Sequence, residues 1–240
     1  MNSNSLKARQ DKPKHYRGST FSPASREAKN RAAKRQQEAV TDSYLRSSAS
    51  VKAQERDYTG AIALLSQLIN RHPDNAIDYN NRGLVYFQSG EPTLAIVDYD
   101  KALQLNPQLA SAYNNRANYY AAGGQLETAI ADYDQAINLN PSYVRAWLNR
   151  GITLRDLGQY EQAIENFDIA LLLGQIQGHI YAERGRTYHL WGDWNYAIAD
   201  YRRALTHLPQ TSASAKTDPA SRLRLKVEKE LNQLLTPLET

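Results

Sequence analysis

The sequence predicts an all-α protein built from stacked helical repeats, and two observations lead to this prediction. The stretch from Asn80 to Pro107 recurs 34 residues later, from Asn114 to Pro141, and weaker copies precede and follow these two. Within each copy, apolar and small residues recur at three- and four-residue spacing, which is typical of amphipathic helices. A fixed period of about 20 to 50 residues is the signature of a stacked repeat protein.

The repeated region divides into five units that begin near residue 41. A Gly-centred turn separates the two predicted helices in each of the last four units, and Asn-Pro or His-Pro closes the first three units. Proline stops the second helix there, because it cannot continue a helix and biases the preceding residue away from helical geometry. The predicted units span residues 41–75, 76–109, 110–143, 144–177 and 178–211.

The spacing aromatic-x2-Arg-Gly-x2-Tyr, followed by Ala-x3-aromatic-x2-Ala and then Pro, resembles the tetratricopeptide repeat over about 170 of the 240 residues. This resemblance implies a right-handed α-solenoid of about five helix–turn–helix repeats plus a C-terminal capping helix. Paired helices are expected to approach most closely at small residues of the first helices, which are Gly83, Ala117, Gly151 and Gly185. The second helices carry small residues that are expected to face the first helices, which are Ala61, Ala95, Ala129, Ala163 and Ala197.

Arginine and aspartate also recur with the repeat. The arginines precede the small residue of each first helix, at Arg82, Arg116, Arg150 and Arg184, where the family pattern usually has leucine. The second helices carry Asp98, Asp132 and Asp200, with Asn166 in the corresponding place of the fourth unit. We interpret this pattern as a ladder of Arg–Asp pairs between neighbouring helices, with each Arg stem packed on apolar surface. A role in ligand binding is the alternative.

The net charge of +4 comes from the N-terminal arm. Residues 1–40 hold ten Lys or Arg against three Asp or Glu, whereas residues 41–211 hold fourteen against eighteen. The arm reads as mostly disordered, with a possible polar helix over residues 23–40 that is either solvated or formed on a partner. We expect a cytoplasmic protein; the alternative is an organelle stroma or matrix, if residues 1–26 act as a transit peptide.

Residues 212–240 are expected to form a linker and a capping helix. Leu223, Val227, Leu231 and Leu234 are spaced to make one apolar stripe, and Asp218-Pro219 is a helix start signal. Such a helix would cover the exposed end of the last unit, which repeat arrays generally need. The alternative is an amphipathic helix that binds a partner.

Motifs for catalysis are missing from the sequence. Cysteine is absent, which excludes disulfides and thiolate chemistry, and neither a Gly-Lys-Ser/Thr loop nor a G-x-G-x-x-G motif occurs. The five histidines form neither an H-x3-H pair nor an H-E-x-x-H motif. We therefore expect no enzyme activity, no cofactor and no metal site, and no apolar run approaches a membrane span.

The resemblance places the functional surface on the first helices, which line the concave groove of such a superhelix. Asn81, Asn115 and Asn149 are similar to the asparagine ladder of peptide-binding family members, whose amides bond an extended backbone. The predicted peptide-binding residues are Asn80, Asn81, Leu84, Phe87, Asn114, Asn115, Asn118, Arg145, Asn149, Arg155 and Arg186. They predict a groove that is apolar and amide-rich at one end and basic at the other. A peptide with a hydrophobic segment and an acidic segment or free carboxylate would complement it.

The carboxylate clamp of chaperone-binding family members needs two Lys and one Arg at set places. Those places hold Asn80, Arg145 and Asn149 here, so only one is basic and we do not expect chaperone C-termini to bind. The leading hypothesis is a non-enzymatic scaffold or assembly adaptor that holds an extended peptide segment of another protein. The alternative is an RNA- or ribosome-associated factor that uses the basic residues of segment 1–38, with the repeats as scaffold.

Overall fold

The computed structural model describes residues 23–210 and 218–236, and the chain divides into two units, residues 1–44 and 45–240. Helix α1 (Pro23–Gln54) runs through this boundary. Residues 23–40, predicted as a possible helix, are therefore helical, but the helix does not end at residue 40. Residues 24–54 contain neither Gly nor Pro, so nothing in the chain interrupts the helix before the turn at Arg56 and Asp57.

The described part of the first unit is a polar helix. Arg31 pairs with Glu27 at 3.1 Å and Lys34 with Glu38 at 3.9 Å, and all four side chains are exposed. Pairs of this kind add only tenths of a kcal/mol, roughly 0.3–0.5, to helix stability. Ser22-Pro23 is a helix-start signal in the sequence, with Ser22 as the expected cap, and Ser22 lies outside the described residues.

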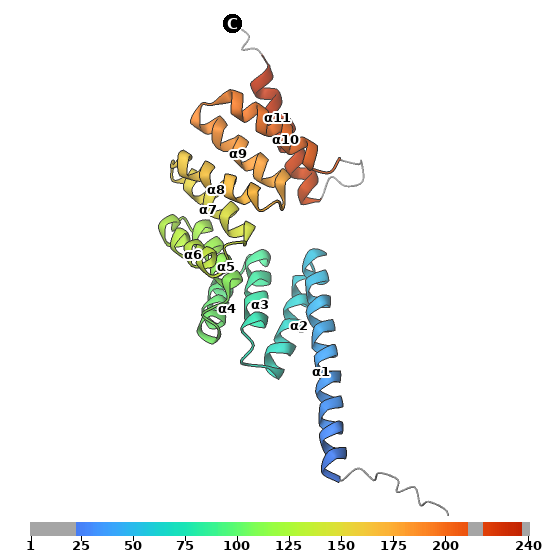
Figure 1. Cartoon of the computed structure of the whole chain (residues 1–240). Helices are drawn as coiled ribbons and strands as arrows, with labels where there is room; N and C mark the ends of the chain where they lie inside the picture. The colour runs from blue at the N-terminus through green and yellow to red at the C-terminus, as the bar shows by residue number, and fades with distance from the viewer. Residues whose placement is uncertain (1–22, 211–217, 237–240) are drawn as a thin grey trace, which may run out of the picture. The chain divides into compact units, whose positions relative to one another are not determined.

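The second unit is an α-solenoid (Figure 1). The second half of α1 packs on α2, and the other helices follow as pairs joined by short turns. The described ranges hold eleven helices and no strand, which confirms the predicted all-α fold. The remaining helices are α2 (Tyr58–Arg71), α3 (Ala76–Ser89), α4 (Pro92–Leu105), α5 (Ala110–Ala122), α6 (Leu126–Leu139), α7 (Val144–Asp156), α8 (Tyr160–Leu172), α9 (Gln177–Trp191), α10 (Trp194–His207) and α11 (Pro219–Leu235).

Paired helices come closest at the predicted glycines. A Cβ added at Gly83 would lie 2.8 Å from the ring of Tyr99, and one at Gly151 would lie 2.7 Å from the ring of Phe167. Both rings are fully buried and cannot withdraw without opening the core. The small residue on one helix and the ring on the next therefore set the spacing of each pair, as the sequence predicts.

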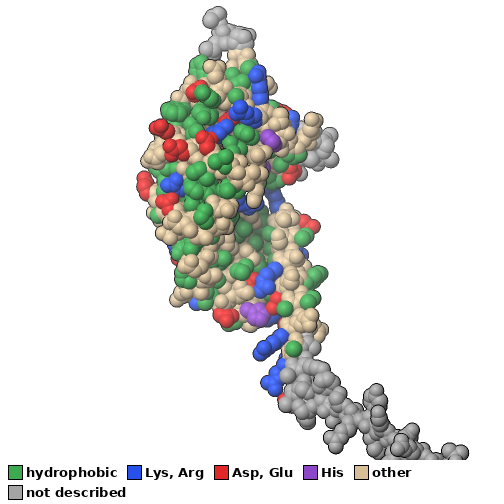
Figure 2. All heavy atoms as spheres, in the orientation of Figure 1, with side chains coloured by type: hydrophobic (Ala, Val, Ile, Leu, Met, Phe, Trp, Pro, Cys, Tyr) green, Lys and Arg blue, Asp and Glu red, His purple; other side chains and the backbone are tan. Residues whose placement is uncertain are grey.

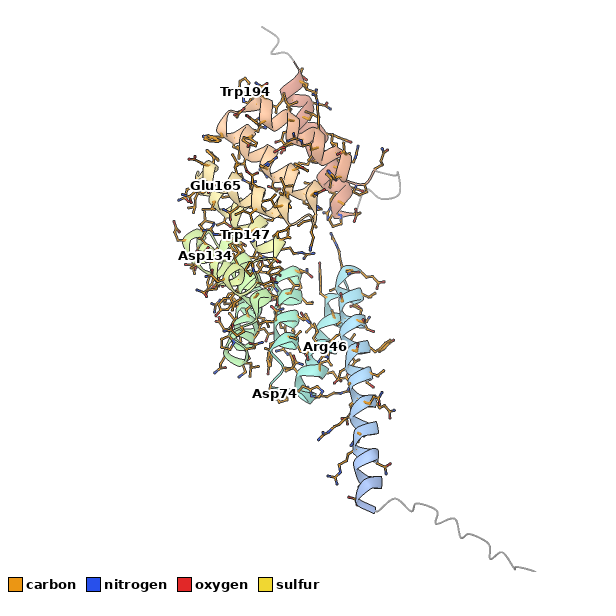
Figure 3. All side chains as sticks on the ribbon, viewed as in Figure 1. Arg46, Asp74, Asp134, Trp147, Glu165 and Trp194 are labelled. Atoms are coloured by element: carbon orange, nitrogen blue, oxygen red, sulfur yellow. The ribbon has the colours of Figure 1, made fainter. Side chains whose placement is uncertain are left out.

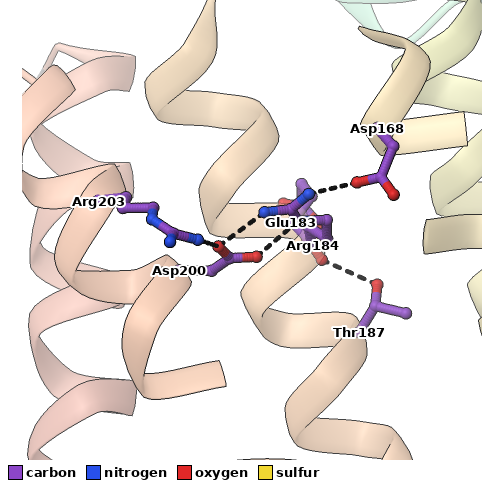
Figure 4. A network of polar contacts seen from close by, with 6 residues as sticks. All are labelled: Asp168, Glu183, Arg184, Thr187, Asp200 and Arg203. Carbon is purple, nitrogen blue, oxygen red and sulfur yellow. Dashed lines mark hydrogen bonds and ion pairs between the residues drawn. The ribbon is translucent and has the colours of Figure 1, made fainter. Parts of the chain in front are cut away.

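The Arg–Asp ladder is present, and it reaches further than predicted. Arg82 bonds Asp98 of its own unit through Nε and Nη2, both at 2.8 Å, and bonds Ser66 Oγ of the preceding unit through Nη1 at 3.1 Å. Arg184 repeats the arrangement with Asp200 in its own unit and Asp168 in the preceding one (Figure 4). Each guanidinium thus ties its own second helix to the second helix before it.

Helix α11 covers the end of the last unit. Val227 and Leu231 are buried against a cluster that includes Ala204 of α10 and the adjoining Leu208. Arg224 donates from Nη1 to the carbonyl oxygens of Leu205 at 2.8 Å and Leu208 at 3.1 Å, so it satisfies acceptors that the end of α10 leaves open. The capping role is therefore confirmed for the described residues, while most of the linker lies outside them. No helix of the described chain has the length and apolar character needed to cross a bilayer.

Candidate binding groove

A pocket of about 350 Å³ opens between the second half of α1, α2, α3 and the first turn of α7. Figure 2 shows the hollowed face of the molecule beside α1, where this pocket lies. We call it the groove pocket. Its lining residues are Arg46, Ala49, Ser50, Ala53, Gln54, Leu65, Asn81, Leu84, Val85, Gln88 and Arg145.

The groove pocket combines an apolar wall with a polar rim. Leu65, Leu84 and Val85 form the apolar part, and they belong to or adjoin the core between α1, α2 and α3. The positive charge of Arg46 (labelled in Figure 3) is directed at buried Asp78, with Nε–Oδ1 2.6 Å and Nη2–Oδ2 2.8 Å. Arg145, by contrast, is exposed at the rim and brings a cation to the pocket.

Three predicted residues come together in this pocket: Asn81, Leu84 and Arg145. Arg145 belongs to the fourth unit and the other two to the second, so the curvature of the repeat stack brings them to one site. Asn81 accepts a bond from Asn80 at 3.4 Å, and its own Nδ2 has no partner within residues 23–210 and 218–236. Asn81 therefore retains a donor for a ligand.

The other two ladder asparagines, Asn115 and Asn149, donate to asparagines of the preceding first helix. Asn115 Nδ2 donates to Asn80 Oδ1 at 3.0 Å, and Asn149 Nδ2 donates to Asn114 Oδ1 at 3.2 Å and Asn118 Oδ1 at 3.0 Å. These bonds join α3 to α5 and α5 to α7. The prediction that Asn115 and Asn149 present free amides to a peptide is therefore corrected, because the preceding first helix takes both N–H donors of Asn149 and one of the two N–H donors of Asn115.

Burial supports the same correction. Asn80, Asn114 and Asn115 are buried, and Asn118 also accepts from the Tyr133 hydroxyl at 2.7 Å. A buried amide whose partners are satisfied is worth more to stability than to binding, since exchanging them would leave a polar atom unpaired. We call these five asparagines (80, 114, 115, 118 and 149) the amide network.

Phe87 lies away from the groove pocket. It lines a second pocket of about 430 Å³ at the turns of the second and third units, together with Pro92, Tyr119 and Tyr120. Tyr119 and Tyr120 meet edge to face with ring centroids 5.4 Å apart. The expectation that Phe87 and Leu84 share one ligand surface is therefore not met, because they line separate pockets.

The predicted basic end of the groove is weaker than its residue types indicate. The Arg155 side chain is only 5% exposed and pairs with Glu183 at 2.5 Å and with Asp156 at 3.1 Å. Its charge is satisfied within the protein, which corrects the prediction that it meets an acidic ligand. Arg186 is partly exposed. Burial lowers the pKa of His179, with Arg145 acting in the same direction and Glu183 opposing it, so this imidazole adds little positive charge at neutral pH.

Sequence reasoning missed the contribution of α1 to the groove pocket. Arg46, Ala49, Ala53 and Gln54 come from the degenerate first unit, which lacks the motif that located the groove elsewhere. Their three- and four-residue spacing (46, 49, 53) marks one helix face in the sequence. Within the described ranges, no group of three His, Asp or Glu side chains is placed to hold a metal ion.

Comparison with known proteins points to one family. Five family models, each described as a tetratricopeptide or TPR repeat, match residues 30–75, 76–109, 98–131, 117–154 and 142–217. No curated protein sequence matches the chain.

Solved structures share the fold at low identity. MamA is 22% identical with a TM-score of 0.55, over 75% of this chain and 95% of MamA. PilW, a type IV pilus biogenesis factor, is 20% identical with a TM-score of 0.65, over 82% of this chain and 99% of PilW. A thermophilic TPR protein of Thermus thermophilus is 19% identical with a TM-score of 0.65, over 81% of this chain and 98% of that protein. At these identities the likeness extends to the fold and not to a shared partner.

Proposed function

Because the chain belongs to the tetratricopeptide repeat family, we propose that it is a non-enzymatic scaffold or assembly adaptor that holds an extended peptide segment of another protein. The observation that carries the proposal is the groove pocket, where an apolar wall, an unused amide donor and an exposed cation meet. Pockets with mostly apolar walls and a few placed polar groups are the usual form of a binding site.

The pocket chemistry selects the ligand. A leucine- or phenylalanine-sized side chain placed against Leu65 and Leu84 would gain about 1.5–3 kcal/mol from burial. Asn81 Nδ2 would bond a backbone carbonyl of the bound segment, and Arg145 would pair with a carboxylate. The segment thus carries a large apolar side chain followed by an acidic residue or a free C-terminus.

The remaining charged groups do not favour catalysis. In the described repeats, the buried Asp98, Asp132 and Asp200 are bonded by ladder arginines, and buried Arg155 is paired with Glu183. Groups held in bidentate or buried pairs serve helix packing, and they are poorly suited to proton transfer.

Selection from a displayed random-peptide library tests the proposal with the full chain as bait. We expect enriched peptides to combine an apolar residue with an acidic residue or C-terminal carboxylate. Leu84→Glu should weaken the binding of a selected peptide at least tenfold, because the apolar side chain would meet a charge. Arg145→Glu should reverse the charge preference of the selected peptides.

Leu172→Glu is the matched control, since Leu172 is 87% exposed and lies outside the groove pocket. It should leave peptide affinity unchanged. Unchanged affinity in Leu84→Glu, or a library that yields no binding peptide, would contradict the groove assignment. Salt-sensitive RNA capture that is lost on deletion of residues 1–38 would instead favour the basic arm as the functional part.

A further inference from the structure

The turn between α9 and α10 exposes two tryptophans that the repeat does not require. Trp191 is 51% exposed and Trp194 is 62% exposed, and they account for two of the three tryptophans in the chain. The corresponding turn positions of the fourth unit hold Leu157 and Tyr160. The third and second units have Gly123 with Leu126, and Ser89 with Pro92, at these positions. A feature confined to one turn is therefore not a requirement of the repeat fold.

The two indoles border an open pocket of about 370 Å³, which is lined by residues 191–195. Asp193 lies between the tryptophans at the start of α10, and Figure 3 labels Trp194 at the periphery of the repeat stack. Further aromatic surface adjoins the pocket, because the Tyr160 ring lies 6.4 Å from Trp191 and exposed Tyr196 stacks on Tyr188 at 5.1 Å. We call residues 191–195 the tryptophan turn.

The Asp193 carboxylate is available to a ligand. It occupies the N-cap position of α10, yet its side chain makes no capping bond, whereas Asp57 at the same position of α2 accepts from Gly60 at 2.9 Å. Exposed Glu161 directly follows Tyr160 on α8, and exposed Glu165 lies further along this helix. Within residues 23–210 and 218–236, none of these three carboxylates forms an ion pair.

The charge of the surroundings decides between possible occupants. The pocket lining, residues 191–195, holds Asp193 and no Lys or Arg, and the nearest arginines in the sequence are Arg186 and Arg202. The positive end of the α10 dipole, equivalent to about half a charge, is outweighed by the full negative charge of Asp193. An anionic membrane surface or a nucleic acid backbone would be repelled, and a cation would be attracted.

From this geometry we propose that the tryptophan turn binds a basic segment of a partner polypeptide. A Lys or Arg side chain enters between Trp191 and Trp194, stacks its charge against the indole faces and pairs with Asp193. Cations over Trp rings are attracted by the ring quadrupole, and the Asp193 carboxylate adds a charge-assisted hydrogen bond. This surface is separate from the groove pocket and does not depend on what binds there.

Fluorescence anisotropy with labelled peptides tests the proposal on the full chain. The probe is a Gly/Ser peptide containing three Arg and Lys residues, and its matched partner carries Glu at the same places. We expect the basic peptide to bind and the acidic one not to bind. A Trp191→Ala/Trp194→Ala variant should lose about tenfold or more in affinity. Asp193→Asn should also weaken binding, by a smaller factor.

Two controls separate a built site from general charge attraction. Asp74→Asn removes an exposed acid elsewhere on the surface, and Leu84→Glu alters the groove pocket; neither should weaken the basic peptide. Helicity and melting temperature of each variant confirm that the repeats remain folded. The proposal would be overturned if the tryptophan variant bound the basic peptide as tightly as the wild type does. It would also be overturned if Asp74→Asn weakened binding as much as Asp193→Asn, or if the acidic peptide bound as tightly as the basic one. Each of these outcomes leaves the groove assignment unaffected.

Discussion

Arg116 pairs with Asp132 through two parallel bonds, Nε–Oδ2 at 2.7 Å and Nη2–Oδ1 at 2.9 Å. Its third nitrogen, Nη1, reaches Asp100 of the preceding unit at 2.8 Å. The fourth unit departs from this arrangement because Asn166 stands where the second, third and fifth units have aspartate. There Arg150 makes a single bond to Asn166 Oδ1 at 3.0 Å, and its Nε lies 2.7 Å from Asp134 without hydrogen-bond geometry.

Asn166→Asp should therefore stabilise the protein. The new carboxylate would accept two charge-assisted bonds from Arg150, as Asp132 does from Arg116, and the variant would lose the Asn166 bond to the Gln162 carbonyl at 2.7 Å. The gained bonds should outweigh the lost one, so the variant should have a free energy of unfolding about 1 kcal/mol higher than that of the wild type. Urea unfolding followed by circular dichroism measures it. Asp132→Asn, the reverse change one unit earlier, should cost a similar amount; a lower stability for Asn166→Asp would contradict the ladder as described.

Tyr99→Phe and Tyr133→Phe should differ in their effect on the free energy of unfolding. The Tyr99 hydroxyl is buried without a partner among the described residues, so its removal should leave stability unchanged or raise it by about 1 kcal/mol. The Tyr133 hydroxyl donates to Asn118 at 2.7 Å, so its removal should cost about 1 kcal/mol. Phe167 already occupies the corresponding core position of the fourth unit. Thermal unfolding of both variants checks the pair, and equal losses would refute the distinction.

Local spacing was sufficient to predict the fold. Gly83 and Tyr99 meet because each repeats with the 34-residue period, and a contact inside one unit follows directly from that period. The continuity of α1 was also open to prediction, since residues 24–54 lack Gly and Pro. The predicted boundary at residue 40 rests on amino-acid composition, which changes there, whereas the helix continues to Gln54.

The candidate site was less predictable because it depends on the angle between units. The approach of Arg145 to Leu84 and the bond from Asn115 to Asn80 both depend on how far each unit rotates relative to the last. Side-chain packing sets that rotation, and the repeat motif does not encode it. The motif therefore identified the asparagines as special, but it could not distinguish an amide that meets a ligand from one that meets the neighbouring helix.

Ile176→Asn should stabilise the junction between the fourth and fifth units. Ile176 adopts φ 45° and ψ 35°, a left-handed conformation that is unfavourable for a β-branched residue by about 1–2 kcal/mol. Asparagine tolerates this conformation, and the apolar burial lost from Ile176, which is 39% exposed, offsets part of the relieved strain. We expect a gain of about 1 kcal/mol in urea unfolding. Gly174→Ala in the same junction is the opposing control and should destabilise, since Gly174 has φ 75°; a loss in Ile176→Asn would argue against strain at this residue.

His179 should make the protein less stable as the pH falls below neutrality. Burial is the main cause that lowers its pKa in the folded protein below the ordinary value of about 6.5, Arg145 acts in the same direction, and Glu183 and Asp218 oppose them. The unfolded chain therefore binds a proton at this residue at a higher pH than the folded chain does. The stability that depends on neutral His179 is fully present above about pH 6.5 and is lost as the pH falls through the pKa of His179 in the folded protein.

The measurement compares urea unfolding at about pH 7.5 and about pH 5.5, on either side of the ordinary histidine pKa, for the wild type and for two neutral replacements, His179→Gln and His179→Leu. Both replacements remove the proton uptake of the unfolded state at this position, so both should lose less stability on acidification than the wild type does. The two side chains differ in polarity, and an effect that they share reports the missing titration and not a change in packing. If the free energy of unfolding fell by the same amount between the two pH values in the wild type and in both variants, His179 would not contribute to the acid sensitivity.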